Sequence, residues 1–469
     1  MDSAVFLGRQ QDLKILEETA SKPGFQMTVI YGRRRIGKSL LITEFCKDKK
    51  ASYYIADKTS IAANVKKWSE QFIEDVIPQA EGASFEDLDK FFQFVANCAK
   101  QERIILALDE IPYIAEADES FLSQFQRGID SILSKANVYL IICGSAISFM
   151  EKEILSEKSP IFGRRTNQIF LKPFDYKDSA LFVPNFTNQE KAITYGVTGG
   201  VAKYLSLFDD SQSLDLNLIN IFFKTSGYMY EEPMNLLTQE FRSIANYNAV
   251  IEECSKGANR LNEISDKTHI STPALSYIIT NLMTMGIISR IQAITEEKNK
   301  KKIRYEITDG MYRFWYCFVF PSKSAIEMGY GEHYYYNNVK PKLHEFMGKT
   351  FEQMCREFTL NQGLTGRLNA FISQTGIWWG TAHNREQTDI DVVGLDSAAK
   401  KAVLGECKFK NEPVDKDVYD ALEARKGLIS HQYKEAQLLL FSLSGFSKWL
   451  QTQTDKNEVR LINIDEMYE

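Results

Sequence analysis

The sequence predicts an α/β chain made of three consecutive modules. Apolar, strand-like runs alternate with helical stretches over the first 210 residues, which is the pattern of a parallel sheet covered on both faces. A glycine-containing loop joins the first of these strands to a helix. Near the other end, an amphipathic helix precedes two strand-like runs that carry acidic residues. A length of 469 residues suits about three domains of 100 to 200 residues each.

Composition places the chain among soluble globular proteins. Hydrophobic residues make up 44% and charged residues 25%, unlike a disordered tail or a membrane protein. Apolar stretches such as 311–320 are too short to span a bilayer, and the first four residues lack the order of a signal peptide. Scattered cysteines and histidines indicate neither disulfides nor zinc, so a cytoplasmic location is expected. The net charge of -6 restricts any DNA contact to local basic patches.

The first strand, 27–31, ends in a loop with the spacing of a phosphate-binding loop. In such a loop, glycines let backbone N–H groups face the phosphates, a lysine reaches the β and γ oxygens, and a hydroxyl at the helix N-terminus ligates Mg²⁺. The expected nucleotide-binding residues are Gly32, Arg33, Arg34, Arg35, Ile36, Gly37, Lys38 and Ser39. The loop therefore predicts binding of a nucleoside triphosphate with Mg²⁺.

Two carboxylates end a second apolar strand, 103–108, about 70 residues after the loop. Asp109 is placed to hold Mg²⁺ through water, and Glu110 to orient or deprotonate the attacking water. The position downstream of a phosphate loop favours this interpretation over an ordinary strand end, which is the alternative for both residues.

Two further features complete the first module. The last of four expected strands (27–31, 51–55, 104–108 and 138–143) is followed by Gly144 and Ser145. Ser145 is either a sensor beside the γ-phosphate or a simple turn serine. Arg164 and Arg165 precede another strand, where arginines suit the neutralisation of charge on a transferring phosphate. They would act within the chain or in a neighbouring subunit of a homo-oligomer, and structural ion pairing is the alternative.

Together these residues resemble the AAA+-related, STAND-like P-loop ATPases that are abundant in archaea and also occur in bacteria. The resemblance extends over the segments 6–13, 109–113, 143–145 and 163–165. Residues 199–205 are similar to the family's Gly-Gly-x-Pro-x-Tyr-Leu lid signature, with Ala202 where proline is usual. The resemblance implies an ATPase domain with a helical lid over residues 1–210, and ATP as its nucleotide.

The middle module, 211–325, combines helical spacing with two later strand-like runs. Three helices followed by a hairpin predict a winged helix-turn-helix. The expected recognition helix, 273–285, contains no lysine or arginine, whereas the wing tip, 296–302, is basic. This distribution of lysines favours nonspecific DNA contact over sequence-specific recognition. An equal alternative is that the domain does not contact DNA and is a spacer or a nucleotide-sensing hinge.

Four residues of the terminal module, 326–469, indicate a second chemistry. Glu352 lies on an expected amphipathic helix, and Asp391 lies on a strand-like run. Glu406 and Lys408 share one face of the next run, and cross-strand pairing brings Asp391 beside them. Converging carboxylates repel each other unless a divalent cation holds them, and oxygen ligands favour Mg²⁺ or Mn²⁺. Lys408 can then orient or help deprotonate a water that attacks a phosphodiester.

This order of residues resembles the PD-(D/E)XK nuclease superfamily, in the Holliday-junction-resolvase-like branch fused to archaeal-type ATPases. By resemblance, Asp391 takes the family's aspartate, Glu406 and Lys408 its acid-x-lysine pair, and Glu352 its helix glutamate. Asp389 is either an auxiliary ligand or a surface carboxylate. The resemblance implies an α/β restriction-endonuclease-like domain with DNA as its partner.

The order of the modules predicts an ATP-hydrolysing protein whose nucleotide state is coupled to a metal-dependent nuclease acting on DNA. Two alternatives stay open. One is a STAND-like switch or DNA-binding ATPase without nuclease activity, and the other is a motor that translocates DNA.

Overall fold

The computed structural model describes residues 6–241, 243–296, 302–382, 385–429, 433–453 and 459–469. The chain divides into two compact units. The N-terminal unit comprises Met1–Phe174 and Val201–Tyr204, and the C-terminal unit comprises Asp175–Gly200 and Leu205–Glu469. No helix in the described ranges is long and apolar enough to cross a membrane.

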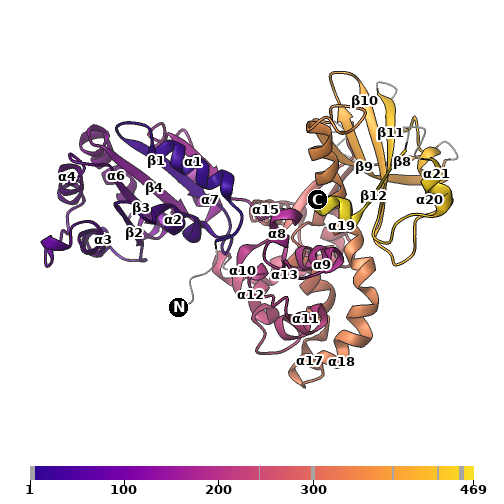
Figure 1. The fold of residues 1–469 in the computed structure, drawn as a ribbon. Helices are drawn as coiled ribbons and strands as arrows, with labels where there is room; N and C mark the ends of the chain where they lie inside the picture. The colour runs from indigo at the N-terminus through magenta and orange to yellow at the C-terminus, as the bar shows by residue number, and fades with distance from the viewer. Residues whose placement is uncertain (1–5, 242, 297–301, 383–384, 430–432, 454–458) are drawn as a thin grey trace. The chain divides into compact units, whose positions relative to one another are not determined.

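The N-terminal unit is built on a five-stranded sheet with the order β2-β3-β4-β1-β5 (Figure 1). All neighbouring strands are parallel. The strands are β1 (Gln26–Tyr31), β2 (Ala51–Ile55), β3 (Ile104–Asp109), β4 (Val138–Gly144) and β5 (Asn167–Phe170). Every residue of β1, β3 and β4 is buried, as expected for central strands covered on both faces. The predicted parallel α/β sheet is therefore confirmed.

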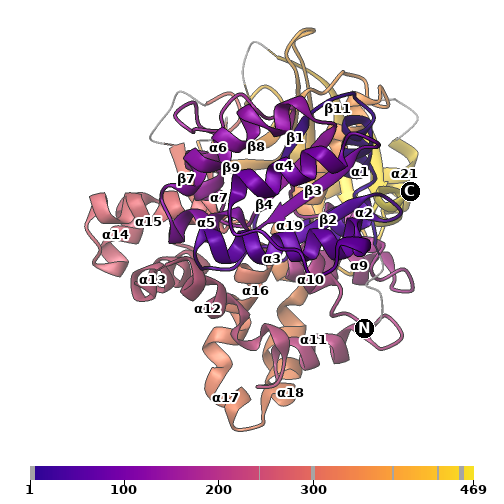
Figure 2. The same ribbon diagram turned by 90° about the vertical axis from the view of Figure 1, so that its left-hand side faces the viewer.

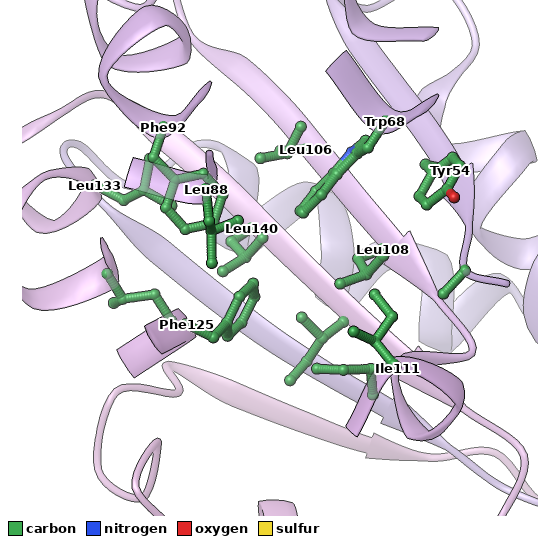
Figure 3. Close-up of a cluster of buried hydrophobic side chains, with 14 of the residues drawn as sticks. Tyr54, Trp68, Leu88, Phe92, Leu106, Leu108, Ile111, Phe125, Leu133 and Leu140 are labelled. Carbon is green, nitrogen blue, oxygen red and sulfur yellow. The ribbon is translucent and has the colours of Figure 1, made fainter. Parts of the chain in front are cut away.

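Helices cover both faces of this sheet (Figures 1 and 2). They are α1 (Gln10–Ala20), α2 (Lys38–Cys46), α3 (Ile61–Val76), α4 (Leu88–Cys98), α5 (Ile111–Ala117), α6 (Phe121–Ser131) and the short α7 (Ile147–Phe149). On one face, Trp68 of α3, Phe92 of α4 and Phe125 of α6 pack on Leu106 and Leu140 of the sheet (Figure 3). Residues of α1 and α2 form a second cluster on the other face. The two clusters hold the sheet rigid, so the loops at its carboxyl edge are presented on a fixed scaffold.

The C-terminal unit begins with a group of helices. Their bounds are α8 (Tyr176–Ala180), α9 (Asn188–Thr198), α11 (Leu214–Phe222), α12 (Tyr228–Glu240), α13 (Ile244–Ser255), α14 (Leu261–Thr268) and α15 (Thr272–Thr284), and α10 (Ala202–Leu205) bridges the two units in sequence. After α15, β6 (Ile288–Gln292) and β7 (Ile303–Ile307) pair in antiparallel fashion. This is the predicted order of three helices and a hairpin. Most of the predicted wing tip, 297–301, lies outside the described residues.

A helical connection leads to the long helix α19 (Leu343–Leu364). The connection before α19 contains α16 (Gly310–Phe314), a π-helical turn at Trp315–Val319, α17 (Lys323–Glu327) and α18 (Gly331–Tyr334). Aromatic side chains of this connection form part of the core, and Tyr312, Phe314 and Trp315 are fully inaccessible.

A second five-stranded sheet, with the order β12-β11-β10-β9-β8, packs against α19. Its strands are β8 (Gln374–Thr381), β9 (Gln387–Asp396), β10 (Lys401–Lys408), β11 (Lys434–Ser442) and β12 (Val459–Asn463). The remaining helices are α20 (Lys416–Glu423), α21 (Lys448–Gln453) and α22 (Ile464–Tyr468). β9 and β10 form the predicted antiparallel hairpin, whereas β10, β11 and β12 run parallel.

Residues 175–200 cluster with the C-terminal unit, although the predicted first module extends to residue 210. Two glycines explain this packing. A Cβ atom on Gly196 of α9 would lie 2.5 Å from the Met347 sulfur of α19, and one on Gly310 would lie 2.3 Å from the Gly196 carbonyl oxygen. The approach of Gly310 to a backbone carbonyl requires glycine, whereas the Met347 side chain could move aside for a Cβ atom on Gly196, so the Gly310 contact is the one that fixes α9 against α16. The division into three modules at residues 210 and 325 stays a prediction.

Glu357 on α19 is a partly buried carboxylate with one unmatched oxygen. Its Oε1 accepts a hydrogen bond from Gln353 (2.9 Å), and its buried Oε2 has no partner in the described part of the chain. Burial raises the pKa of Glu357 above its ordinary 4.5, and the Gln353 hydrogen bond opposes this only in part. The folded state therefore holds this proton more tightly than the unfolded chain, so stability is lost as pH rises above the ordinary value.

We expect Glu357→Gln to stabilise the C-terminal unit at pH 8 by about 1 kcal/mol, because the charged form is no longer buried. The gain should shrink toward pH 4, where the wild-type carboxyl is protonated in both states. Thermal unfolding followed at several pH values measures this. Glu332→Gln, at an exposed position, is the matched control, and an equal gain at pH 4 and pH 8 would contradict the assignment.

Candidate functional site

The phosphate loop lies between β1 and α2, as predicted. Gly32 has φ 153°, and a Cβ atom there would lie 2.4 Å from the Leu171 carbonyl oxygen, so the position requires glycine. Gly37 has φ 97° and caps the N-terminus of α2. The Lys38 ammonium donates hydrogen bonds to the carbonyl oxygens of Gly32 (2.9 Å) and Arg33 (3.0 Å). The loop therefore curls around its own lysine, which places a positive charge at the centre of the cradle.

Ser39 and Asp109, the two residues expected to hold Mg²⁺ at the nucleotide, are in direct contact. The Ser39 hydroxyl donates to Asp109 Oδ2 at 2.6 Å, and the Glu110 N–H donates to Asp109 Oδ1 at 2.8 Å. Asp109 is only 2% exposed. A hydroxyl beside a carboxylate at a helix N-terminus is a donor set of hard oxygens, which fits Mg²⁺.

Sequence reasoning missed Tyr53 of β2, whose hydroxyl also donates to Asp109 Oδ2 at 2.6 Å. Burial and the Asp109 carboxylate raise the pKa of Tyr53, so the hydroxyl stays protonated and acts as a donor. Tyr53 lies opposite Ala107 in the paired strands β2 and β3. The strand order, which the sequence does not reveal, is the only signal that brings it to Asp109.

Tyr53→Phe is expected to weaken Mg²⁺-dependent ATP turnover about 10-fold, because a hydrogen bond that orients a metal-holding carboxylate is lost. The readout is ATPase rate titrated with Mg²⁺, in which the half-saturating Mg²⁺ concentration should rise. Tyr54→Phe is the matched control, because the Tyr54 hydroxyl donates to Asn64 (2.9 Å) instead. If both variants titrate like the wild type, Tyr53 does not orient Asp109.

Glu110 and Ser145 are hydrogen-bonded to each other. Glu110 Oε2 accepts from the Ser145 hydroxyl (3.0 Å) and from the Ser145 N–H (3.3 Å). Glu110 also has a left-handed backbone, φ 53°, which is unusual for glutamate and is typical of strained functional positions. The predicted base and the predicted sensor thus lie together at the ends of the neighbouring strands β3 and β4.

The loop is braced from two sides within the N-terminal unit. Arg9, from the segment that resembles the family's first box, donates to the carbonyl oxygens of Ile36 (3.3 Å) and Lys172 (2.6 Å). The Lys203 N–H, in the lid-signature segment, donates to the Arg35 carbonyl oxygen at 3.1 Å. The lid signature therefore contacts the phosphate loop even though Ala202 replaces the usual proline. Arg34 donates to the Tyr113 hydroxyl (3.3 Å), downstream of Glu110.

The two predicted arginines lie in different surroundings. Arg164 makes two hydrogen bonds to the carboxylate of Asp130 (2.9 and 2.8 Å), which is the ion-pairing alternative. Arg165 donates to the Leu155 carbonyl oxygen at 3.2 Å. Burial and Glu151 raise the pKa of Tyr31, and the charge of Arg165 partly opposes them. Arg165 directly precedes Thr166, whose N–H donates to the Met27 carbonyl oxygen at 2.7 Å, so the backbone of Arg165 lies at the amino end of β1, opposite the phosphate loop.

In the C-terminal unit, Asp391 and Glu406 lie at the point where β9 and β10 separate. The paired register ends at Val392 opposite Gly405. Directly beyond it, the Asp391 carboxylate accepts the Cys407 N–H (2.9 Å). The Lys408 ammonium donates to Glu406 Oε1 at 2.7 Å.

Glu352 belongs to the same cluster, because its charge acts on the pKa of Asp391. Burial raises the pKa of Asp391 to about 7, and the charges of Glu406 and Glu352 add to the shift. The pKa of Glu352 is raised by burial, which the neighbouring cations Arg356 and Lys349 partly oppose. The four predicted residues of the terminal module are therefore close enough to influence one another. Asp389 also raises the pKa of Glu352, so it borders the cluster.

Two arginines that sequence reasoning missed neutralise this cluster. Arg425, just after α20, forms an ion pair with Glu406 Oε2. Arg356, one helical turn after Glu352, lies 3.7 Å from its carboxylate and donates to the Asp391 carbonyl oxygen at 2.8 Å. Arg356 had a sequence signal, the i to i+4 spacing on one helix, but Arg425 had none. Within the described ranges, no three His, Cys, Asp or Glu side chains converge as a metal-binding group.

Comparison with known proteins identifies an ATPase domain in the first part of the chain. The profile of an ATPase domain found predominantly in Archaea matches residues 6–208. An uncharacterized protein of Methanocaldococcus jannaschii, MJECL04, is 31% identical over 418 residues, which are 88% of this chain and 89% of that protein. The chain is a P-loop ATPase of the MJECL04 family. A second uncharacterized M. jannaschii protein, MJ0424, is 38% identical over 66 residues, 13% of this ATPase and 64% of MJ0424.

A solved structure supports the fold of this P-loop ATPase. The Walker-type ATPase paby2304 of Pyrococcus abyssi aligns with a TM-score of 0.50 and 19% identity, over 66% of the present chain and 96% of the other. Residues 315–425 match a family of archaeal and bacterial proteins of unknown function. That match contains Glu352, Asp391, Glu406 and Lys408, so the comparison leaves their role open.

Proposed function

We propose that this P-loop ATPase couples its nucleotide state to a metal-dependent nuclease site that acts on DNA. The observation that carries the proposal is the convergence of Asp391, Glu406, Lys408 and Glu352 from two strands and one helix. Two acids and a lysine at the point where two strands separate are the groups that phosphodiester hydrolysis requires. The terminal domain would then be a restriction-endonuclease-like member of the PD-(D/E)XK superfamily.

The donor set of this cluster fits Mg²⁺ or Mn²⁺. Mg²⁺ in proteins is commonly held by only one or two carboxylates together with waters, so Asp391 and Glu406 suffice. The bound ion would supply charge neutralisation at the phosphodiester and a more acidic water. Lys408, hydrogen-bonded to Glu406, is placed to orient that water, and Glu352 to accept a proton. Burial is the main cause of the raised pKa of Asp391, and the charges of Glu406 and Glu352 add to it, so a bound cation would stabilise the ionised form.

One observation favours a second candidate, a STAND-like switch or DNA-binding ATPase without nuclease activity. Lys408 and Arg425 already neutralise Glu406, so a divalent ion must displace Arg425 to reach both carboxylate oxygens. A site built to stay an internal ion pair would have the same contacts. The two candidates therefore differ in whether Mg²⁺ or Mn²⁺ enters the cluster.

At the nucleotide site, we assign roles residue by residue. The backbone of residues 32–39 cradles the phosphates of ATP, and Lys38 contacts the β and γ oxygens. Ser39 and Asp109 hold Mg²⁺, and Glu110, positioned by Ser145, orients the attacking water. Arg165 precedes the amino end of β5, at the edge of the sheet opposite the phosphate loop, which argues against a role within the chain and favours one in a partner subunit. Arg164 would act in a partner subunit only by leaving Asp130.

We further propose that α13 to α15 with β6 and β7 form a winged helix domain that contacts DNA without reading its sequence. The exposed face of α15 presents Ser276, Tyr277 and Thr280 and no cation. These uncharged polar side chains suit weak contact with the phosphate backbone of DNA more than recognition of its bases. The residues of the predicted wing that carry most of its lysines lie outside the described ranges.

The direct test is incubation of the full chain with linear, circular and branched DNA. Each substrate is given Mg²⁺ or Mn²⁺, with ATP, with a non-hydrolysable ATP analogue or with no nucleotide. The proposal predicts cleavage that chelation by EDTA abolishes and that responds to nucleotide. Intact DNA under every condition, combined with ATP turnover in the same preparation, would favour the switch.

A further inference from the structure

A pocket of about 720 Å³ lies within the C-terminal unit, and it adjoins the Asp391 cluster through Arg313, Glu306 and Lys349 of its wall, which interact electrostatically with Glu352. Its walls come from the end of α13, from β7, from α16 with the turn that follows it, and from the start of α19. A volume of this size falls in the range of small-molecule sites, which is about 300 to 1,000 Å³. None of Asp391, Glu406 and Lys408 lines it.

Arg313 of α16 lies in the wall of this pocket without an ion pair in the described part of the chain, although the more distant carboxylates of Glu352, Glu306 and Asp309 act on its charge. Its guanidinium donates to the Thr350 hydroxyl and lies 4.3 Å from the centroid of the Phe346 ring. Among the described residues, no carboxylate oxygen lies within 4.0 Å of it. Burial lowers the pKa of Arg313 to about 10, so it remains a cation at neutral pH. A desolvated guanidinium with unused N–H donors is costly unless an anion binds it.

The other charged groups of the wall largely cancel one another. Lys256 pairs with Glu252 (2.7 Å), and Lys349 pairs with Glu306 (3.0 Å). In the described part of the chain, the exposed Lys342 at the start of α19 and Glu345 one turn later form no ion pair. With the two ion pairs set aside, Arg313 and Lys342 stand against Glu345, so the side chains of the wall carry one net positive charge, which the carboxylates of Glu352 and Asp309 outside the wall oppose in part.

The rest of the wall is aromatic. Five rings contribute to it, those of Tyr305, Tyr316, Phe318, Phe320 and Phe346. Flat rings stack on such side chains, and an oxyanion forms bidentate hydrogen bonds with a guanidinium. A pocket with one buried arginine among several aromatic rings therefore selects for a ligand that is both flat and anionic.

We propose that this pocket binds a small organic anion with a flat aromatic body, its oxyanion on Arg313 and its ring among the aromatic side chains. The shared chemistry covers nucleoside monophosphates and aromatic carboxylates. The site is separate from the ATP-binding loop, and it is independent of whether the terminal domain cuts DNA.

The test uses isothermal titration calorimetry on the full chain carrying Lys38→Ala, which weakens nucleotide binding at the phosphate loop. The probes are AMP and 1-naphthoate, with adenosine and inorganic phosphate as partial ligands. We expect AMP or 1-naphthoate to bind one per chain, and adenosine and phosphate to bind at least about 10-fold more weakly. Tighter binding of AMP identifies a phosphate ligand, and tighter binding of 1-naphthoate a carboxylate.

Two variants establish where the probe binds. Arg313→Gln should weaken binding about 10- to 100-fold, because a charge-assisted hydrogen bond is lost. Lys342→Glu, at the exposed edge, tests the same pocket if Arg313→Gln fails to fold, and Lys224→Glu at an exposed position elsewhere is its matched control. Loss of binding in Lys342→Glu and not in Lys224→Glu supports the site. No binding of any probe at millimolar concentration, or equal binding in every folded variant, overturns it.

Discussion

Lys38→Ala is expected to lower the rate of ATP turnover by at least about 100-fold. The Lys38 ammonium is only 6% exposed and is held at the centre of the loop by the carbonyl oxygens of Gly32 and Arg33. When ATP is bound, the same ammonium faces the β and γ phosphates, where negative charge develops during hydrolysis. Loss of one preorganised positive group from such a site costs about 100- to 1,000-fold in rate.

Steady-state release of phosphate from ATP measures this effect, with a nucleotide-binding assay to separate turnover from affinity. Lys14→Ala is the matched control, because Lys14 is an exposed lysine of the same unit. Turnover within a few fold of the wild type in Lys38→Ala would mean that the phosphate loop is not the hydrolytic site.

The second large effect is expected at Lys408. Lys408→Ala should reduce metal-dependent DNA cleavage by at least about 100-fold, because the group that orients the attacking water is removed. ATP turnover should be unchanged, since Lys408 belongs to the C-terminal unit. The measurement is the initial rate of cleavage under the metal condition in which the wild-type chain is most active.

Lys410→Ala is the matched control for this prediction. Lys410 lies two residues further along the chain and is exposed, whereas Lys408 is half-buried beside Glu406. A nonspecific loss of DNA affinity would affect both variants equally, and a catalytic role affects Lys408 alone. Equal cleavage by the wild type and Lys408→Ala would point to a contaminating nuclease.

The nucleotide site was largely predictable because its chemistry lies in local sequence. The loop at 32–39 carries its own turn and capping residues, and Asp109 and Glu110 follow a continuous apolar strand. Parallel strands bring these segments to one edge of the sheet regardless of the loops between them. The pattern predicted that Ser39 and Asp109 share one magnesium ion, which agrees with their contact, whereas the hydrogen bond between Glu110 and Ser145 was found only in the structure.

The residues that sequence reasoning missed depend on contacts between distant segments. Tyr53 reaches Asp109 because β2 pairs with β3, and Arg425 reaches Glu406 from a turn 19 residues away. The packing of residues 175–200 with the C-terminal unit depends on close approach at Gly196 and Gly310. Periodicity and motif spacing contain no information about such pairings.

The same limit applies to the terminal cluster, whose charge balance depends on contacts between distant segments. The predicted acids and lysine do come together, but the i to i+4 spacing of Arg356 from Glu352 was overlooked, and no sequence pattern pointed to Arg425. The ion pairs of these arginines are either a metal-free state of a nuclease site or a permanent structural network. The difference is whether a divalent ion can compete with Arg425 for Glu406.

The measurement that tests the central claim most directly is anomalous diffraction from crystals of the full chain soaked in Mn²⁺. A nuclease site predicts a peak about 2.1 Å from one oxygen each of Asp391 and Glu406, with Arg425 moved off Glu406. A soaked crystal with a Mn²⁺ peak beside Ser39 and Asp109, no peak at Asp391, and Glu406 still paired with Lys408 and Arg425 would contradict the nuclease.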